Sequence, residues 1–158
     1  MSDENKGTCQ ILKAYLSDAR EILAIQKSAY LLEAERYSDY NITPLKQTLE
    51  ELIDQFKDHV VLKAILNGKI IGTVRAYEKE GTCYIGRLAV LAEMHNRGIG
   101  TALMKEIETC FHPKRYELFV GAKSDNNIHL YQKIGYHTCR KAAYECRAIE
   151  ILYMEKNG

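Results

Sequence analysis

The sequence predicts an α/β fold, more narrowly an α+β arrangement in which one mixed sheet carries helices on both faces. Three observations support this prediction. The middle of the chain holds three apolar, strand-like segments separated by the turns Asn67-Gly68 and Glu80-Gly81, which is the pattern of an antiparallel meander. Two amphipathic helical segments follow, and each precedes a further strand-like segment. The first of these helices spans about a dozen residues, which suits the crossover that joins two parallel strands.

The N-terminal part of the chain favours one strand and two helices. Residues 9–15 read as a short strand, and Ser17 or Asp18 is suited to cap the helix that follows. That helix carries one apolar and one polar stripe. The tract 35–44 is turn-like, and a second helix starts at its end, with proline near the first turn, and runs to about Phe56.

The remaining elements alternate strands and helices. Asn67-Gly68 joins the first two strands of the meander as a tight hairpin, because both central residues of such a turn take positive φ. Gly135 lies where a left-handed residue ends a helix. The expected elements are strands at 59–66, 69–79, 82–91 and 116–122, a helix from about Gly98, a helix at 126–134, a further strand at 136–142 and a final strand at 148–156.

Length and composition predict a single domain over residues 1–158 and exclude several classes of function. The net charge is +1, with 22 basic and 21 acidic side chains, so the chain lacks the basic field of a nucleic-acid-binding protein. Its five cysteines are odd in number and form no CxxC pair, which argues against a disulfide framework or a metal site. No apolar run reaches about 18 residues and the first residues are polar, so we expect a cytoplasmic protein that does not bind membranes.

The junction "HNRGIG", His95–Gly100, links the third strand of the meander to the next helix. Glycines lack a Cβ, so a ligand can approach the backbone closely at Gly98 and Gly100. The first N–H groups of a helix have no partner within it and the helix dipole adds positive potential, which predicts an anion site suited to phosphate. A P-loop would need Gly-Lys-Ser/Thr here, and a Rossmann turn would need a small residue in place of Leu103. A turn of purely structural purpose is the alternative.

Two motifs at this separation resemble those of the GNAT family of acetyl-CoA-dependent N-acetyltransferases. The signature of the family is Gln/Arg-x-x-Gly-x-Gly/Ala after a strand that ends Leu-x-Val, and this chain has "LAV" at Leu88–Val90 before "HNRGIG". A helix with a tyrosine and then Gly-Phe/Tyr follows in the family, and here it reads "SDNNIHLYQKIGY", Ser124–Tyr136. His95 departs from the usual Gln or Arg, while Ser124 departs from a frequent Asn and Asn127 from the usual Ala. The resemblance spans most of the chain in element order.

The resemblance implies the GNAT fold and acetyl-CoA as co-substrate, with no metal. It implies that the main chain of Leu88, Ala89 and Val90 pairs with the pantetheine arm like an added strand. The resemblance implies that the N–H groups of Arg97, Gly98, Gly100 and Thr101 in the turn that follows face the pyrophosphate. It also implies cofactor contacts for the other residues of this stretch, His95, Asn96 and Ile99, and for Ser124 and Asn127 at the start of the second helical segment.

The resemblance also implies that Tyr131 is catalytic and gives a proton to the leaving thiolate; a core tyrosine of an amphipathic helix is the alternative. A general base is not assigned, because Tyr84 occupies the position where some relatives carry a Glu. Glu33 and Glu35, on the first helix, are candidates to take a proton through water or to attract a cationic amine. The alternative for both is a solvated helix face.

The predicted function is therefore transfer of the acetyl group of acetyl-CoA to a primary amine by direct attack in a ternary complex. One alternative is an acyl-CoA-binding module without catalysis, and another is an acyltransferase that uses a different short acyl-CoA. The expected partners are acetyl-CoA and an amine, with neither nucleic acid nor membrane. Many members of the family dimerise, so a homodimer stays open. The sequence does not identify the acceptor.

Overall fold

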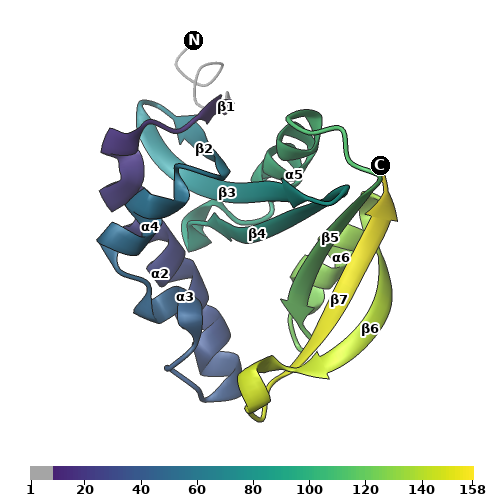
Figure 1. The fold of residues 1–158 in the computed structure, drawn as a ribbon. Coiled ribbons are helices and arrows are strands. Elements are labelled where there is room, and N and C mark those ends of the chain that lie inside the picture. The colour runs from purple at the N-terminus through teal and green to yellow at the C-terminus, as the bar shows by residue number, and fades with distance from the viewer. Residues whose placement is uncertain (1–8) are drawn as a thin grey trace.

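The computed structural model describes residues 9–158 and shows one seven-stranded mixed sheet flanked by helices (Figure 1). The strand order is β1-β2-β3-β4-β5-β7-β6. The strands are β1 (Gln10–Lys13), β2 (Val60–Leu66), β3 (Lys69–Lys79), β4 (Thr82–Val90), β5 (Arg115–Gly121), β6 (His137–Ala143) and β7 (Glu150–Asn157). The helices are α2 (Ala19–Tyr37), α3 (Thr43–Lys46), α4 (Leu49–Gln55), α5 (Ile99–Thr109) and α6 (Asp125–Lys133). The predicted fold class is confirmed.

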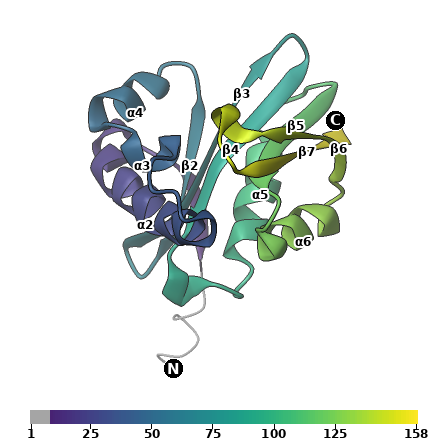
Figure 2. The ribbon, with the colours of Figure 1, turned by 90° about the horizontal axis from the view of Figure 1, so that it is seen from below.

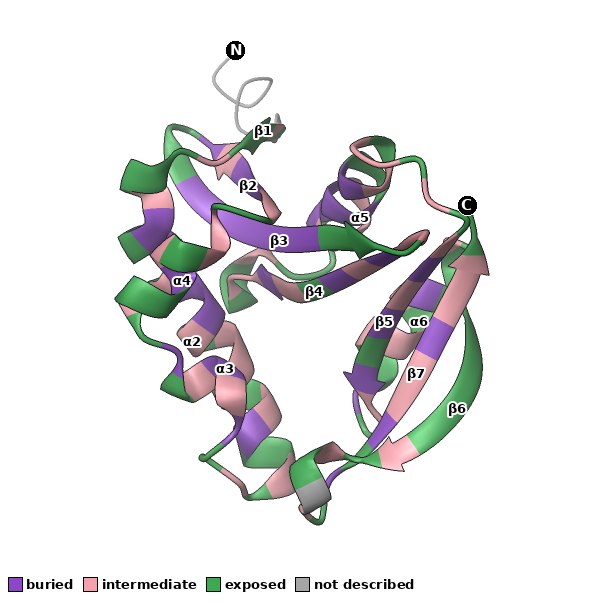
Figure 3. Ribbon diagram, viewed as in Figure 1, coloured by how far each residue is buried: buried purple, intermediate pink, exposed green. Residues whose placement is uncertain are grey.

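Strands β2, β3 and β4 form the predicted antiparallel meander. Both connecting turns have left-handed residues where a two-residue hairpin needs them: φ is 52° at Asn67 and 75° at Gly68, and 52° at Glu80 and 84° at Gly81. Helix α5 then crosses over to β5, which pairs with β4 in parallel, as the length of the connection predicts. Strand β7 lies antiparallel between β5 and the exposed edge strand β6 (Figure 3).

The parallel pair is short, and this shortness opens the sheet. Only the first three residues of β4, Thr82–Tyr84, pair with β5. The rest of β4 has no strand on that side, so its backbone groups there are left for other partners. A bulge adds one residue to β4 opposite β3, and Arg87 within it has a left-handed φ of 55°.

The helices cover both faces of the sheet (Figure 2). Helices α5 and α6 pack on one face, where the largest apolar core contains Leu103, Met104 and Ile107 of α5 together with buried side chains from five strands. Helices α2 to α4 cover the other face of the meander, where Ile22 and Leu52 pack against Val61. Among the described residues, no helix combines the length and the apolar composition that crossing a membrane requires.

The segment between α2 and β2 differs from the expectation in two ways. Helix α2 continues to Tyr37 and ends at the left-handed Ser38, so the turn-like tract is shorter than predicted. The single helix expected from Thr43 to Phe56 is broken into α3 and α4 by an extended residue, Gln47. Thr48 starts α4 with a capping box: its hydroxyl accepts from the Glu51 N–H at 3.1 Å, and the Glu51 carboxylate accepts from the Thr48 N–H at 2.8 Å.

Candidate functional site

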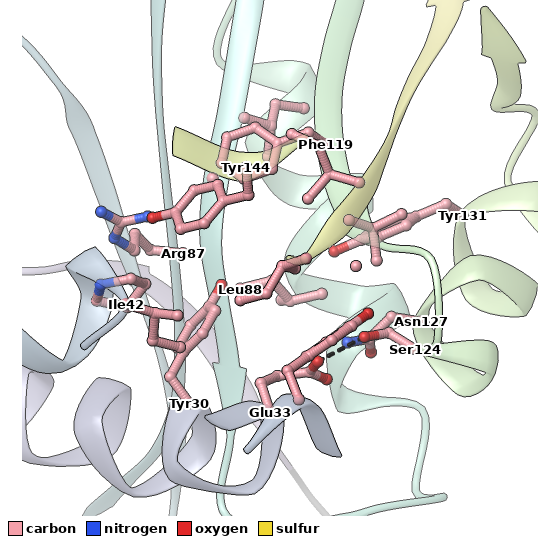
Figure 4. A pocket seen from close by; sticks show the side chains of 18 residues that line it. Tyr30, Glu33, Ile42, Arg87, Leu88, Phe119, Ser124, Asn127, Tyr131 and Tyr144 are labelled. Atoms are coloured by element: carbon pink, nitrogen blue, oxygen red, sulfur yellow. Dashed lines mark hydrogen bonds between the residues drawn. The ribbon is translucent and has the colours of Figure 1, made fainter. Parts of the chain in front are cut away.

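A cavity of about 110 Å³ lies where β4 and β5 diverge (Figure 4). Helix α2 contributes its wall on one face of the sheet, and α6 contributes the wall on the other face. Residues of β4 and β5 line the gap between them. The cavity therefore connects the two faces of the sheet, so that two molecules can meet in it from opposite sides.

Tyr131 lies on α6 and its phenol oxygen points into the cavity (Figure 4). The residue is 6% exposed, and its ring packs edge-on to that of Tyr136. Burial raises the pKa of the Tyr131 phenol well above its ordinary value, and the nearby Tyr30 and Glu33 add to the effect. The phenol therefore keeps its proton at neutral pH and is able to donate it.

Glu33 and Ser124 join α2 to the start of α6 across one wall of the cavity. The Ser124 hydroxyl donates to Glu33 Oε2 at 2.6 Å, and Arg36 Nη1 lies 3.3 Å from Glu33 Oε1. Ser124 is the N-cap residue of α6, but its side chain makes no capping bond because it is committed to Glu33. Glu35 is exposed and does not line the cavity. Of the two predicted carboxylates, the structure brings only Glu33 to the cavity.

Two segments that are distant in sequence meet beside the cavity. Arg147, before β7, makes a two-pronged ion pair with Asp39, after α2. The Thr43 hydroxyl donates to the Glu145 carboxylate beside it. These contacts lie beside an apolar part of the cavity lining. Its members are Ile42, Pro44, Tyr144, Ile149 and Ile151.

The glycine turn lies outside the cavity wall, at the start of α5. The N–H groups of residues 96–101 donate no backbone hydrogen bond to any described residue, and no side chain caps the helix. Gly98 is left-handed, with φ of 78°, and a Cβ built there meets nothing within 4 Å. Gly100 is glycine for a different reason, because a Cβ there would lie 2.9 Å from the side chain of Leu130 on α6. The turn thus presents a row of unpaired donors to open space.

The predicted cofactor residues follow one path from this turn to the cavity. Leu88, Ser124 and Asn127 line the cavity, whereas the other predicted residues do not. Ala89 and Val90 continue the unpaired part of β4 from Leu88 towards the turn. The His95 ring donates through Nε2 to the Val90 carbonyl oxygen at 3.0 Å, so its side chain fastens the turn to the strand.

Two arginines near the cavity were not predicted as site residues. Arg75, on β3, is 3% exposed and donates to Gln26 Oε1 and Gln47 Oε1, both at 2.9 Å. Burial, together with the nearby Arg87 guanidinium, lowers the pKa of Arg75 to about 10. Arg87 lines the cavity, and its Nε is buried without a partner among the described residues. The one signal in the sequence for these arginines was that Arg75, a charged residue, lies inside the apolar run of β3.

A second hollow of about 300 Å³ lies beside the cavity and shares Ile85, Gly86, Arg87 and Phe119 with it. Arg75 also lines this hollow. Within residues 9–158, His, Cys, Asp and Glu side chains form no cluster of three or more arranged to hold a metal ion.

Comparison with known proteins agrees with this architecture. An acetyltransferase of the GNAT family from Streptococcus pneumoniae is 24% identical, with a TM-score of 0.74 over 95% of this chain and 99% of that one. The PaiA N-acetyltransferase from Thermoplasma acidophilum, solved in complex with coenzyme A, is 17% identical, with a TM-score of 0.77 over 96% of this chain and 99% of that one. A phosphinothricin acetyltransferase from Sinorhizobium meliloti, in complex with acetyl-CoA, is 18% identical, with a TM-score of 0.77 over 95% and 88%.

None of the curated protein sequences matched the chain. The family model described as "Acetyltransferase (GNAT) family" matches residues 19–136, which is more than half of the chain. The matched region starts with α2 and includes the meander, the glycine turn and all of α6. The chain therefore belongs to the GNAT acetyltransferase family.

Proposed function

We propose that the protein transfers the acetyl group of acetyl-CoA to a primary amine while both substrates are bound. The observation that carries this proposal is the row of unpaired N–H groups at residues 96–101, which continues from the unpaired edge of β4. Membership of the family supports it, as do the coenzyme A and acetyl-CoA complexes of similar folds.

The turn fits the pyrophosphate of acetyl-CoA. Its donors are aligned with the positive end of the α5 dipole, and the open space at Gly98 lets an anion reach them. The edge of β4 at Leu88, Ala89 and Val90 has no strand on the β5 side and suits the amides of the pantetheine arm, because strand-edge groups need partners; of these groups, the Val90 carbonyl oxygen already accepts from His95. A cofactor held along this path reaches the cavity from the α5 and α6 side and leaves the α2 side to the amine.

Acetyl-CoA supplies an activated acyl group, and Tyr131 is proposed to protonate the sulfur that leaves. A raised phenol pKa alone would make this donation harder, because an ordinary thiol has a pKa of about 8.5. Burial acts on thiols in the same direction: it raises the pKa of the buried Cys83 thiol to about 12. A thiolate that leaves among the apolar side chains of the cavity would be partly desolvated too, so the two pKa values rise together and donation stays accessible.

Glu33 is proposed to attract the cationic amine to the cavity. Ser124 and Arg36 hold its carboxylate in the wall, which limits the positions it can take. This arrangement supports a positioning role, and no residue is assigned as the general base.

Gly98→Val tests the cofactor site, with Gly68→Val as a matched control. Both glycines are left-handed, with φ of 78° and 75°, and a Cβ at either position meets nothing within 4 Å, so both variants suffer similar backbone strain. Only Gly98 lies at the turn, so calorimetry is expected to show a loss of coenzyme A affinity of about 10-fold or more in G98V and little change in G68V. If folded G98V bound coenzyme A with the same affinity as the wild type, the proposal that the turn is the cofactor site would be overturned.

Thiol release from acetyl-CoA in the presence of an amine panel tests the reaction. We expect release that depends on the amine. Tight binding of coenzyme A without release for any amine would instead support the acyl-CoA-binding module.

A further inference from the structure

Arg87 carries a positive charge into the cavity, and the described residues do not neutralise it. The bulge in β4 gives it a left-handed backbone and places it at the junction of the cavity and the second hollow. Its Nε is the one buried side-chain nitrogen or oxygen in the described residues without a hydrogen-bond partner. A buried, unsatisfied donor on a charged group is costly, so its presence indicates that a partner arrives from outside the chain.

Arg75 adds a second positive charge behind Arg87. Its guanidinium is buried and donates to the side chains of Gln26 and Gln47, which are neutral amides. Those bonds fix the orientation of the group and leave its charge uncompensated. Buried charges are ordinarily paired with an opposite charge. Gln47 lies at the break between α3 and α4. Because it leaves the helix there, its side chain can accept the hydrogen bond from Arg75.

The acidic residues around the cavity are already engaged elsewhere. Glu33 is held by Ser124 and Arg36, and Glu117, in the wall of the second hollow, pairs with Arg115 at 2.9 Å. In the segments beside the cavity, Asp39 pairs with Arg147 and Glu145 accepts from Thr43. Neither Arg75 nor Arg87 has an ion-pair partner among the described residues, so an anion that enters beside them would find two uncompensated positive charges.

We propose that the acceptor amine carries a carboxylate, as an amino acid does, and that Arg87 binds this carboxylate with Arg75 behind it. The inference rests on the proposed function. Arg87 lies at the end of the cavity away from Tyr131 (Figure 4), so a carboxylate held there leaves the amine free to extend towards the proposed proton donor. The planar guanidinium matches a carboxylate with two parallel bonds. Apolar residues line the space between, which favours a small acceptor with an apolar body.

The phosphate groups of acetyl-CoA do not supply the anionic partner of Arg87. Its proposed phosphate site is the turn at residues 96–101, which does not line the cavity. An acceptor with a phosphate group would share the same chemistry, so the test has to separate phosphate from carboxylate.

The test compares matched ligands that do not require turnover. N-acetylated glycine, alanine, leucine, β-alanine and 4-aminobutyrate are each titrated as the acid and as the amide into the protein saturated with coenzyme A. For the best pair, calorimetry is expected to show the acid binding about 10- to 100-fold more tightly than the amide. In Arg87→Gln the two affinities become equal. Arg20→Gln, which removes the same charge at an exposed position of α2, keeps the preference.

Equal affinities for every acid and amide in the wild type would overturn the proposal, whether or not the variant folds. A preference that survives in folded R87Q would overturn the role of Arg87. Tighter binding of N-acetyl-O-phosphoethanolamine than of any carboxylate would overturn the carboxylate and assign a phosphate-bearing acceptor. Thiol release is then measured with the parent amines. Its absence for all of them would count against the proposed function and leave the binding comparison intact.

Discussion

The Tyr131→Phe variant distinguishes two roles for Tyr131: a catalytic proton donor and a tyrosine that only packs in the core. The change removes one hydroxyl and keeps the ring that packs beside Tyr136. The Tyr131 hydroxyl makes no hydrogen bond to the described residues, so we expect the free energy of unfolding to change by no more than about 0.5 kcal/mol. Loss of a general acid lowers the rate of the chemical step by about 100-fold or more. The affinity for coenzyme A is expected to stay the same.

Tyr136→Phe is the matched control, because it should lower the stability and leave the rate unchanged, whereas Tyr131→Phe should do the reverse. Tyr136 is buried next to Tyr131 but does not line the cavity. Its hydroxyl donates to Glu108 Oε2 at 2.7 Å, and Lys156 contacts the other oxygen of that carboxylate at 2.9 Å. Losing a hydrogen bond to a charged acceptor costs about 1–3 kcal/mol, which corresponds to a fall in Tm of about 2–12 °C. The rate per folded molecule should not change.

The assay measures thiol release with the amine that gives the fastest turnover in the wild type, under single-turnover conditions that report the chemical step. Melting curves of all three proteins accompany it. The reasoning is refuted if Y131F retains the wild-type rate, because the hydroxyl would then have no part in the reaction. It is also refuted if Y131F and Y136F lose rate in proportion to their loss of stability.

Two further predictions concern stability. Thr48→Ala removes the hydroxyl that caps α4 and should lower the free energy of unfolding by about 1 kcal/mol, measured by urea denaturation, whereas an unchanged midpoint would contradict the role of the cap. Burial raises the pKa of Cys83 to about 12, so the folded state holds this proton more tightly than the unfolded chain, and stability should be lost as pH rises from the ordinary thiol range towards 12. Cys83→Ala should weaken that dependence without removing it, because Tyr136 also has a raised pKa, and equal slopes in the two proteins would contradict the assignment.

The parts of the sheet that could be predicted are those in which nearby residues determine the course of the backbone. Asn67-Gly68 and Glu80-Gly81 have the residues that tolerate positive φ, and the length of the crossover requires the parallel step to β5. The continuous helix expected from Thr43 to Phe56 was wrong, because helical periodicity does not report a break that serves a distant partner. Gln47 leaves the helix and binds Arg75, which lies on another element.

The candidate site was predictable in the parts that share a sequence motif. Sequence motifs predict both the glycine turn and Tyr131 as parts of the site. In the structure the turn follows the part of β4 that has no strand on the β5 side, and Tyr131 lines the cavity. Glu33 and Glu35 are equivalent in sequence terms, and only the orientation of α2 distinguishes the one that lines the cavity. Arg87 could not be identified, because its position depends on a bulge formed against β3.

The sequence by itself determined the turns, the order of strands and helices, and the donors at the start of α5, because these follow from backbone preferences and periodicity within a few residues. Tertiary structure alone decided that β7 lies between β5 and β6, that β4 and β5 separate after three paired residues, and that Arg75 and Arg87 line one hollow in which Glu117 pairs with Arg115 instead of with either of them. These features depend on contacts between segments far apart in the chain. Their energies arise from burial and charge, which no short stretch of sequence contains.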